Sequence, residues 1–304
     1  QTQLSGRMDI DTQSMQGPLG ASVELDNASP GRWNEGRVPV RRLQARLRSP
    51  DADRHRLLVE DFDLQLARGA EAAGRWRGNG QWTGARLQVD SRIDELRPQL
   101  LDGRAAQMNM SGPLAFTLTG LPAPDVAARI ATPPDARTLP LAVELHTALE
   151  GRIEGSPHPV KLSLDGTADG QRIELRDLRA EAGNAQAALA FSAQRGAAGA
   201  WQVRSSGRLS DFDPLPWWPG DEGSAWRGGT HRLSGSWALD LTVPRVTPGL
   251  SALALAQGLS GTGTLNIDRS QVAGVPVSMR LELGQRAGSG DAAPSSIQGD
   301  LVVG

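Results

Sequence analysis

Apolar and polar residues alternate with a period of two along most of this chain. The alternation is clearest at 4–10, 21–25, 114–118, 139–145, 160–164, 237–243 and 275–283. Successive side chains of a β-strand point to opposite faces, so each of these segments is expected to be a strand with one apolar and one solvated face. Such strands favour an antiparallel sheet with water on one side over a parallel sheet buried on both.

Helical signals are few. "PDVAARIA" (124–131) begins with Pro and Asp, which suit a helix start, but it extends for only about two turns. "RPQLL" (97–101) is a second candidate for a short helical turn. The connections are rich in Gly, Pro, Asn and Asp, as in "LDNASPG" and "LDGTADGQ", which is turn chemistry. The expected fold class is therefore all-β and mostly antiparallel.

Several segments recur at long spacing. "RLLVEDFDLQL" (56–66) resembles "RIELRDLRAEA" (172–182), at a distance of 172 − 56 = 116 residues, and "RIDELRP" (92–98) resembles "RLSDFDP" (208–214) at the same distance. "MSGPLAFTLTGLP" from Met110 is answered by "LSGSWALDLTVP" from Leu233, and "LSGRMDID" from Leu4 is a third copy. The preserved order predicts large repeats within one continuous array, with approximate units 1–109, 110–232 and an incomplete 233–304. Because the alternation is under way near both ends, we expect the array to be part of a longer protein.

The alternation changes phase at matching places in these segments. Leu57 and Val59 have the opposite parity to Phe62, and Leu175 has the opposite parity to Leu178. A slip of one residue moves side chains to the other face, so each place requires a bulge or a tight bend. Pro39 and Pro276 are expected at strand starts or edges, because proline cannot donate a hydrogen bond to the sheet.

Composition excludes several classes of protein. The net charge is −2, from 32 basic and 34 acidic residues without a basic stripe, which argues against nucleic acid as a partner. The absence of cysteine removes disulfides, thiolate metal sites and cysteine nucleophiles. The longest uncharged run, within 246–267, contains Pro and several Gly residues and does not read as a membrane helix.

Catalytic signals are weak. The four histidines, at 55, 146, 158 and 231, lie far apart, and no sequence typical of a hydrolase or a nucleotide-binding loop is present. "DFD" occurs at 61–63 and 211–213, but alternation alone places such carboxylates on a solvated face. Trp217 and Trp218 could form a carbohydrate-stacking platform, although an aromatic plug at a turn is the favoured interpretation. We therefore expect neither a metal nor a cofactor, and no enzymatic activity.

The segment "SDFDPLPWWPGDEGSAWRGGTHRLSGSWALDLTVP", the "LxGxL" strand openings and the "RIELRDL" strands together resemble the TamB family of the AsmA-like proteins. The resemblance covers most of the chain but consists of degenerate strand patterns. It implies an elongated, U-shaped β-taco whose concave face is an apolar groove. It also implies a periplasmic protein that is anchored in the inner membrane, outside this segment, and that conducts phospholipid for outer-membrane biogenesis, with a possible role in outer-membrane protein assembly. The implied partner is an Omp85-type barrel, as in TamA.

One apolar face built from alternating strands is consistent with such a lipid-binding groove. We expect the strands with the clearest alternation to supply the residues that contact lipid. These groove residues are Leu114, Phe116, Leu118, Leu141, Val143, Leu145, Leu162, Leu164, Leu239, Leu241, Val277, Met279 and Leu281. Their neighbours Thr117, Thr119, Glu144, Asp240, Arg280 and Glu282 are expected to face water.

Two alternative functions are consistent with the same alternation of apolar and polar residues. The first is a structural β-solenoid of a secreted or surface protein, although the rungs of a parallel β-helix repeat at about 20–25 residues rather than 116. The second is an enzyme acting on polysaccharide through the tryptophan cluster and the Asp pairs. A lipid-binding protein should retain lipid on purification, and the two alternatives should not.

Overall fold

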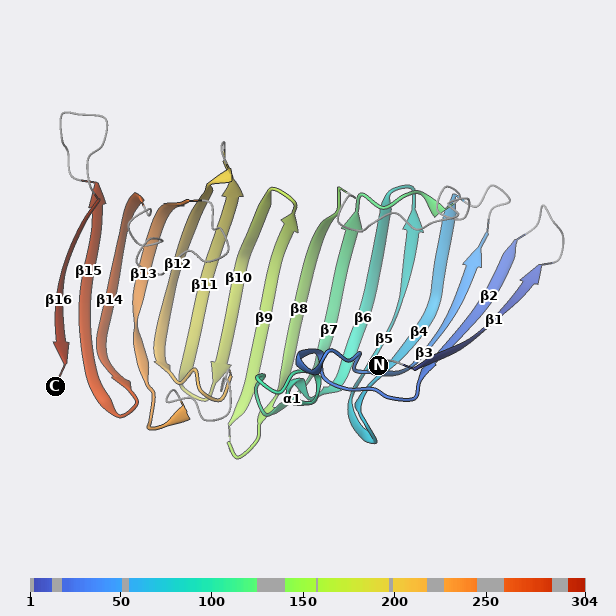
Figure 1. Cartoon of the computed structure of the whole chain (residues 1–304), viewed down its shortest axis with the longest axis horizontal. Coiled ribbons are helices and arrows are strands. Elements are labelled where there is room, and N and C mark those ends of the chain that lie inside the picture. The colour runs from blue at the N-terminus through green and yellow to red at the C-terminus, as the bar shows by residue number, and fades with distance from the viewer. Residues whose placement is uncertain are drawn as a thin grey trace. The chain divides into compact units, whose positions relative to one another are not determined.

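Antiparallel β-strands make up more than half of the chain in the computed structural model (Figure 1). The structure describes residues 3–12, 18–50, 55–124, 140–156, 158–196, 199–217, 227–244, 260–285 and 295–303. The chain divides into an N-terminal unit, residues 1–161, and a C-terminal unit, residues 162–304. The prediction of an all-β, antiparallel architecture is confirmed.

In the N-terminal unit each strand pairs with the strand that precedes it in sequence. The short connections allow this order, because hairpins join antiparallel neighbours directly. The strands are β1 (Leu4–Thr12), β2 (Leu19–Asn27), β3 (Val40–Ser49), β4 (Arg56–Arg68), β5 (Glu71–Thr83), β6 (Arg86–Leu96), β7 (Met108–Thr119) and β8 (Ala142–Ile153). Two short helical turns accompany them, η1 (Trp33–Glu35) and α1 (Pro98–Leu101).

The C-terminal unit repeats this meander. The boundary between the units lies within strand β9 (Pro159–Asp169). Each strand from β11 to β16 pairs in antiparallel orientation with the strand that precedes it in sequence. They are β10 (Arg172–Ala182), β11 (Ala185–Arg195), β12 (Trp201–Phe212), β13 (Leu233–Val243), β14 (Ser260–Val272), β15 (Val275–Gln285) and β16 (Ser295–Val303).

Both predicted phase slips are β-bulges. On β4 the register shifts between Val59 and Phe62, and on β10 it shifts between Leu175 and Leu178. The extra residue keeps the apolar side chains on one face although their parity in the sequence changes. Pro39 lies immediately before β3 and Pro276 is the second residue of β15, so both prolines lie at strand starts as expected.

The buried core of the N-terminal unit is small and lies at one end of the strands. Here the α1 turn packs against β4, β5 and β7 and buries Leu100. Met110 and Val160 are the largest apolar side chains that are fully buried. The turn at "RPQLL" is thus confirmed, whereas the helix expected at 124–131 lies, apart from its first residue, outside the described residues.

Candidate functional site: an apolar sheet face

The predicted groove residues of the N-terminal unit lie on one face. Leu118 pairs directly with Val143, and Phe116 pairs with Leu145. Residues directly opposite each other in an antiparallel pair project to the same side of the sheet. Leu114 lies on this side too, opposite Thr147. Leu141 immediately precedes β8 and is outside the strand.

The same face continues across the unit through strands that supply none of the predicted groove residues. Leu87 and Val89 of β6 pair with Leu118 and Phe116, and they pair in turn with Trp82 and Gly80 of β5. Direct pairing then carries the face through β4, β3, β2 and β1. We call this surface the apolar face of the N-terminal unit. Its members on these outer strands are Leu57, Val59, Phe62, Leu64, Leu43, Leu47, Val23, Leu25, Met8 and Ile10.

The C-terminal unit has an equivalent apolar face. Met279 pairs with Ile267, which pairs with Gly235, and Leu281 reaches Trp237 through Leu265. The remaining predicted residues of β13 and β15, Leu239, Leu241 and Val277, follow the same alternation and lie on the same side.

On β9 the predicted Leu162 and Leu164 share the parity of Gly166. A Cβ atom added to Gly166 would lie 3.4 Å from Leu175 Cδ1, which places this side of β9 beside the apolar residues of β10. All the predicted groove residues of the strands therefore lie on the apolar faces of their units.

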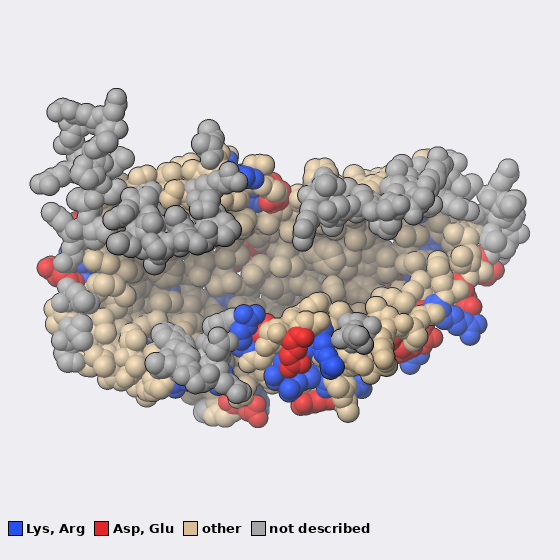
Figure 2. Space-filling view, viewed as in Figure 1, with Lys and Arg blue, Asp and Glu red and all other residues tan. Residues whose placement is uncertain are grey.

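These apolar faces are not sealed from solvent. Val143 is 36% exposed, and Met8 and Ile10 on β1 are 58% and 60% exposed. The predicted Phe116, Leu239 and their apolar neighbours are half-buried rather than buried. In Figure 2 the middle of the strands in each unit is covered by uncharged residues. Because a packed core leaves its large side chains almost inaccessible, these surfaces differ from a closed sandwich interior.

Polar side chains on the apolar faces are hydrogen bonded within the sheet. Trp76 Nε1 donates to Ser91 Oγ at 2.8 Å, and Ser91 Oγ donates to the carbonyl oxygen of Leu114. In the C-terminal unit Trp237 Nε1 donates to Ser205 Oγ at 2.9 Å. Groups satisfied in this way do not require water, so the surface can be covered by an apolar ligand without a desolvation penalty at these sites.

Two further polar groups follow the same rule, and one departs from it. Thr147 Oγ1 donates to the carbonyl oxygen of Pro113 at 2.8 Å, and the buried Ser270 hydroxyl donates to the carbonyl oxygen of Ser234 at 3.1 Å. Trp82 Nε1 is buried without a hydrogen-bond partner among the described residues. This buried indole N–H is thus an exception to the internal hydrogen bonding of the face.

An aromatic cluster crosses the apolar face of the N-terminal unit. The ring of Phe62 on β4 meets Trp76 on β5 edge-to-face at 5.3 Å, and Trp76 lies 6.2 Å from Phe116 on β7. The small Ser91 on the intervening β6 leaves room for the indole to reach that far. Aromatic side chains supply large and rigid apolar area, so this cluster gives the face a rigid apolar contact surface.

The opposite face of each unit is polar and rich in ion pairs, and we call it the ion-paired face. Arg46 donates to Asp61 at 2.6 and 3.0 Å, and Arg204 Nε donates to Asp240 at 2.9 Å. The residues expected to face water lie here. Thr117 pairs with Glu144, Arg280 Nη2 donates to Glu282 at 2.9 Å, and Thr119 follows the parity of Thr117.

These ion pairs affect the titration of the carboxylates. The hydrogen bond from Arg75 lowers the pKa of Asp63 below its ordinary value. The hydrogen bond from Arg77 lowers the pKa of Asp94 in the same way, with Arg92 adding to the effect. Asp61 and Asp63 of the first "DFD" segment are therefore occupied by Arg46 and Arg75, which suits a solvated face better than acid–base catalysis.

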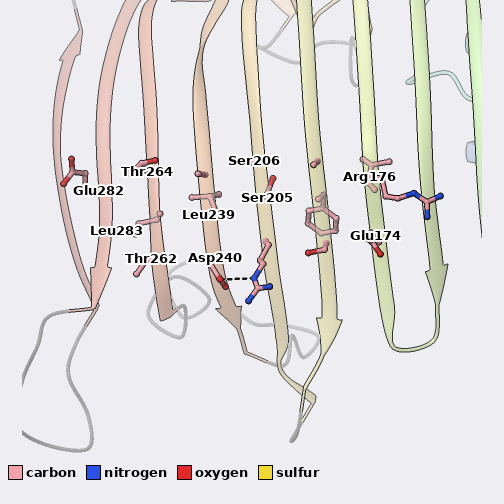
Figure 3. A pocket seen from close by; sticks show the side chains of 17 residues that line it. Glu174, Arg176, Ser205, Ser206, Leu239, Asp240, Thr262, Thr264, Glu282 and Leu283 are labelled. Carbon is pink, nitrogen blue, oxygen red and sulfur yellow. Dashed lines mark hydrogen bonds and ion pairs between the residues drawn. The ribbon is translucent and has the colours of Figure 1, made fainter.

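A shallow hollow of about 750 Å³ lies on the C-terminal unit across β10 to β15 (Figure 3). The Arg204–Asp240 ion pair crosses it, and small side chains such as Ser206 and Thr264 leave the space open. These residues alternate with Ser205 and Leu239 of the apolar face, so the open space lies over the ion-paired face.

The described residues contain no group of His, Asp and Glu that could hold a metal ion. His231 is buried, and its Nδ1 accepts the backbone N–H of Ala273 at 3.3 Å. Trp217 stacks on Phe212 with centroids 6.0 Å apart, whereas Trp218 lies outside the described residues. In the described part of the chain no helix is long and apolar enough to cross a membrane.

Comparison with protein-family models, with curated proteins and with solved structures gives no match to this chain.

Proposed function

We propose that the apolar face binds the acyl chains of phospholipid, as a segment of a non-catalytic bridge-like protein of the periplasm. The observation that carries the proposal is, in each unit, an apolar surface that is only half-buried and on which Trp76, Thr147 and Trp237 are hydrogen bonded within the sheet. A surface of this kind gains free energy when apolar material covers it. Exposed apolar patches larger than a few hundred Å² generally mark interaction sites.

The free energy available is large. Transfer of an acyl chain of about 16 methylenes from water to apolar surroundings gains on the order of 13 kcal/mol, at ~0.8 kcal/mol per methylene. A face open on one side supplies part of this gain, which suits a ligand that must move along the surface as well as bind. The polar headgroup can remain in water while the acyl chain lies on the apolar strands.

The resemblance to the TamB family supports the cellular part of the proposal. On that basis the parent protein is proposed to lie between the two membranes of a Gram-negative bacterium, with an inner-membrane anchor and an outer-membrane barrel of the Omp85 type as partner. Transport of phospholipid between the membranes, with assistance in outer-membrane protein assembly, is the role proposed on that basis. We also propose, on the same basis, that the apolar face forms a groove.

Photocrosslinking at adjacent residues tests the lipid site. Leu145 lies on the apolar face, and its neighbour Glu144 lies on the ion-paired face opposite Thr117. A p-benzoylphenylalanine at 145 should crosslink phospholipid in cells, whereas the same probe at 144 should not. Leu239 and Asp240 form an equivalent pair in the C-terminal unit.

Native mass spectrometry of the purified chain gives an independent result. Bound phospholipid together with face-specific crosslinks supports the proposal. A lipid-free protein that crosslinks equally from both faces would refute it and would favour a structural β-sheet protein. Hydrolysis of a polysaccharide that depends on Asp61 or Asp63 would instead favour an enzyme.

A further inference from the structure

An arginine-lined hollow of about 660 Å³ lies on the ion-paired face of the N-terminal unit, across β3, β4, β5, β6 and β7. Five arginines line it, against two carboxylates. The arginines are Arg41, Arg75, Arg77, Arg92 and Arg97, and the carboxylates are Asp94 and Glu95. This excess of positive charge stands out in a chain whose net charge is −2.

Two of the arginines face each other directly. Arg77 on β5 is the cross-strand partner of Arg92 on β6. Like charges in this position destabilise a sheet. One carboxylate lies between them, because Asp94 accepts a hydrogen bond from Arg77 Nη2 at 2.6 Å and from Arg92 Nε at 3.1 Å. A single negative charge thus serves two guanidinium groups, and further N–H donors remain on each.

The remaining arginines of the hollow differ in how far they are neutralised. Arg75 is held by Asp63, with Nε 2.7 Å from Oδ1. Arg41 Nη2 donates to a backbone carbonyl, that of Gly69, at 2.7 Å. Arg97 Nη1 forms a long ion pair with Glu71, at 3.8 Å. Among the described residues, Arg41 therefore brings positive charge without an ion-paired carboxylate, and the charge of Arg97 is offset only at long range.

The backbone beside the hollow is strained at Glu95. Glu95 has a φ of 51°, a left-handed conformation that is unfavourable for a residue with a side chain. Its N–H is held by Ser111 Oγ at 2.8 Å, and both residues line the hollow. Strain of this kind persists where the surrounding structure imposes it, and it concentrates at functional sites.

The C-terminal unit contains the same arrangement. Asp211, 116 residues after Glu95, has a φ of 46°, and its N–H is held by Ser234 Oγ at 3.0 Å. A hollow of about 670 Å³ surrounds it, lined by Arg208, Arg232 and Arg269. The recurrence of the strain, the serine and the arginine-lined space argues that the hollow is a built feature of both units.

We propose that the arginine-lined hollow of the N-terminal unit binds a phosphate-bearing anion, and that the C-terminal hollow is a weaker copy with fewer arginines. Guanidinium groups match the oxygens of phosphate in geometry and form short charge-assisted hydrogen bonds with them. The phosphate can belong to a soluble anion or to a phospholipid headgroup. The site lies on the face opposite the apolar surface, so it is independent of acyl-chain binding.

The test uses the whole chain and two probes. Isothermal titration calorimetry measures binding of inorganic phosphate, and flotation measures binding to phosphatidylcholine vesicles with and without phosphatidylglycerol. Arg92→Gln and Arg97→Gln each remove one donor group of the hollow and should weaken binding about tenfold. Arg46→Gln is the matched control, because Arg46 lies on the same face and is paired with Asp61 outside the hollow.

Binding that falls in both hollow variants and persists in Arg46→Gln supports the site. A response to inorganic phosphate then identifies a soluble anion as sufficient, and a response only to phosphatidylglycerol vesicles identifies the headgroup. Equal losses in all three variants would reduce the effect to general electrostatic attraction and overturn the proposal, as would absence of binding to both probes. Unchanged thermal unfolding of the variants confirms that folding is not responsible.

Discussion

Replacement of Val143 by aspartate distinguishes an open apolar face from a packed core. Val143 lies on the apolar face of the N-terminal unit and is 36% exposed, whereas Val160 on β9 is fully buried at 0%. Both positions carry valine, Val143 in β8 and Val160 in β9, and both lie within the N-terminal unit. Val143→Asp and Val160→Asp therefore make the same chemical change in two different environments.

The expected losses follow from burial. Full burial of a valine side chain contributes about 1.5–3 kcal/mol. Val143 retains about a third of its exposure, so Val143→Asp should lower the free energy of unfolding by about 1–2 kcal/mol, and the carboxylate can stay hydrated. At Val160 the whole contribution is lost and an unpaired charge is buried as well. We expect a loss of roughly 4 kcal/mol or more for Val160→Asp.

Urea unfolding of both variants and lipid crosslinking from position 145 provide the measurement. Val143→Asp should remain folded and should lose lipid crosslinking, because a carboxylate interrupts the apolar surface. Unfolding of Val143→Asp to the same degree as Val160→Asp would show that the face is a closed core. Normal lipid crosslinking in a folded Val143→Asp protein would refute the acyl-chain site.

Three further predictions concern the sheet itself. Gly207→Ala should destabilise the C-terminal unit by about 1–3 kcal/mol and alter tryptophan fluorescence, because the added Cβ would lie 2.3 Å from the Trp237 ring; an unchanged spectrum and stability would contradict the close approach. Ser111→Ala removes the acceptor that holds the Glu95 N–H and should cost about 1 kcal/mol in chemical unfolding, whereas no change would mean that water replaces the hydroxyl. The pKa of Asp102 is lowered to about 2 by its hydrogen bonds with Arg104, so its contribution to stability is present above about pH 4 and is lost as pH falls toward 2; acid unfolding of Asp102→Asn should lack this component, and identical acid limbs would disprove it.

The strands that the sequence predicts best are those with uninterrupted alternation. β7, β13 and β15 have clear period-two patterns, and their apolar residues share one face as expected. Long-range pairing was not needed for this inference, because alternation alone assigns the two faces of a strand. The ion pairs of the opposite face follow from the same pattern.

Strands that contain several glycines are harder to recognise from the sequence. β5 contains Gly74, Gly78 and Gly80, and a glycine-rich segment reads as a turn or a weak strand. In the structure Gly78 pairs with Phe62 on one side and Ser91 on the other, where small residues leave room for the aromatic cluster. Tryptophans at 76 and 82, with matching parity, were the available signal. The partners that gather around Trp76 come from β4 and β7, which local periodicity cannot identify.

The bulges explain how one face remains apolar along strands that change parity. On β4, Glu60 and Asp61 together oppose the single Asn79 of β5, so Val59 and Phe62 project to the same side. If the same sequence formed a regular strand without the bulge, the alternation beyond Val59 would place Asp61 and Asp63 on the apolar face and Phe62 in water. The same insertion follows Leu175 on β10, 116 residues after Val59. Deleting Glu60 should therefore convert β4 to a regular strand that keeps Val59 and Phe62 on the apolar face and Asp61 on the ion-paired face, so the bulge reconciles the parity of the sequence with a single apolar face.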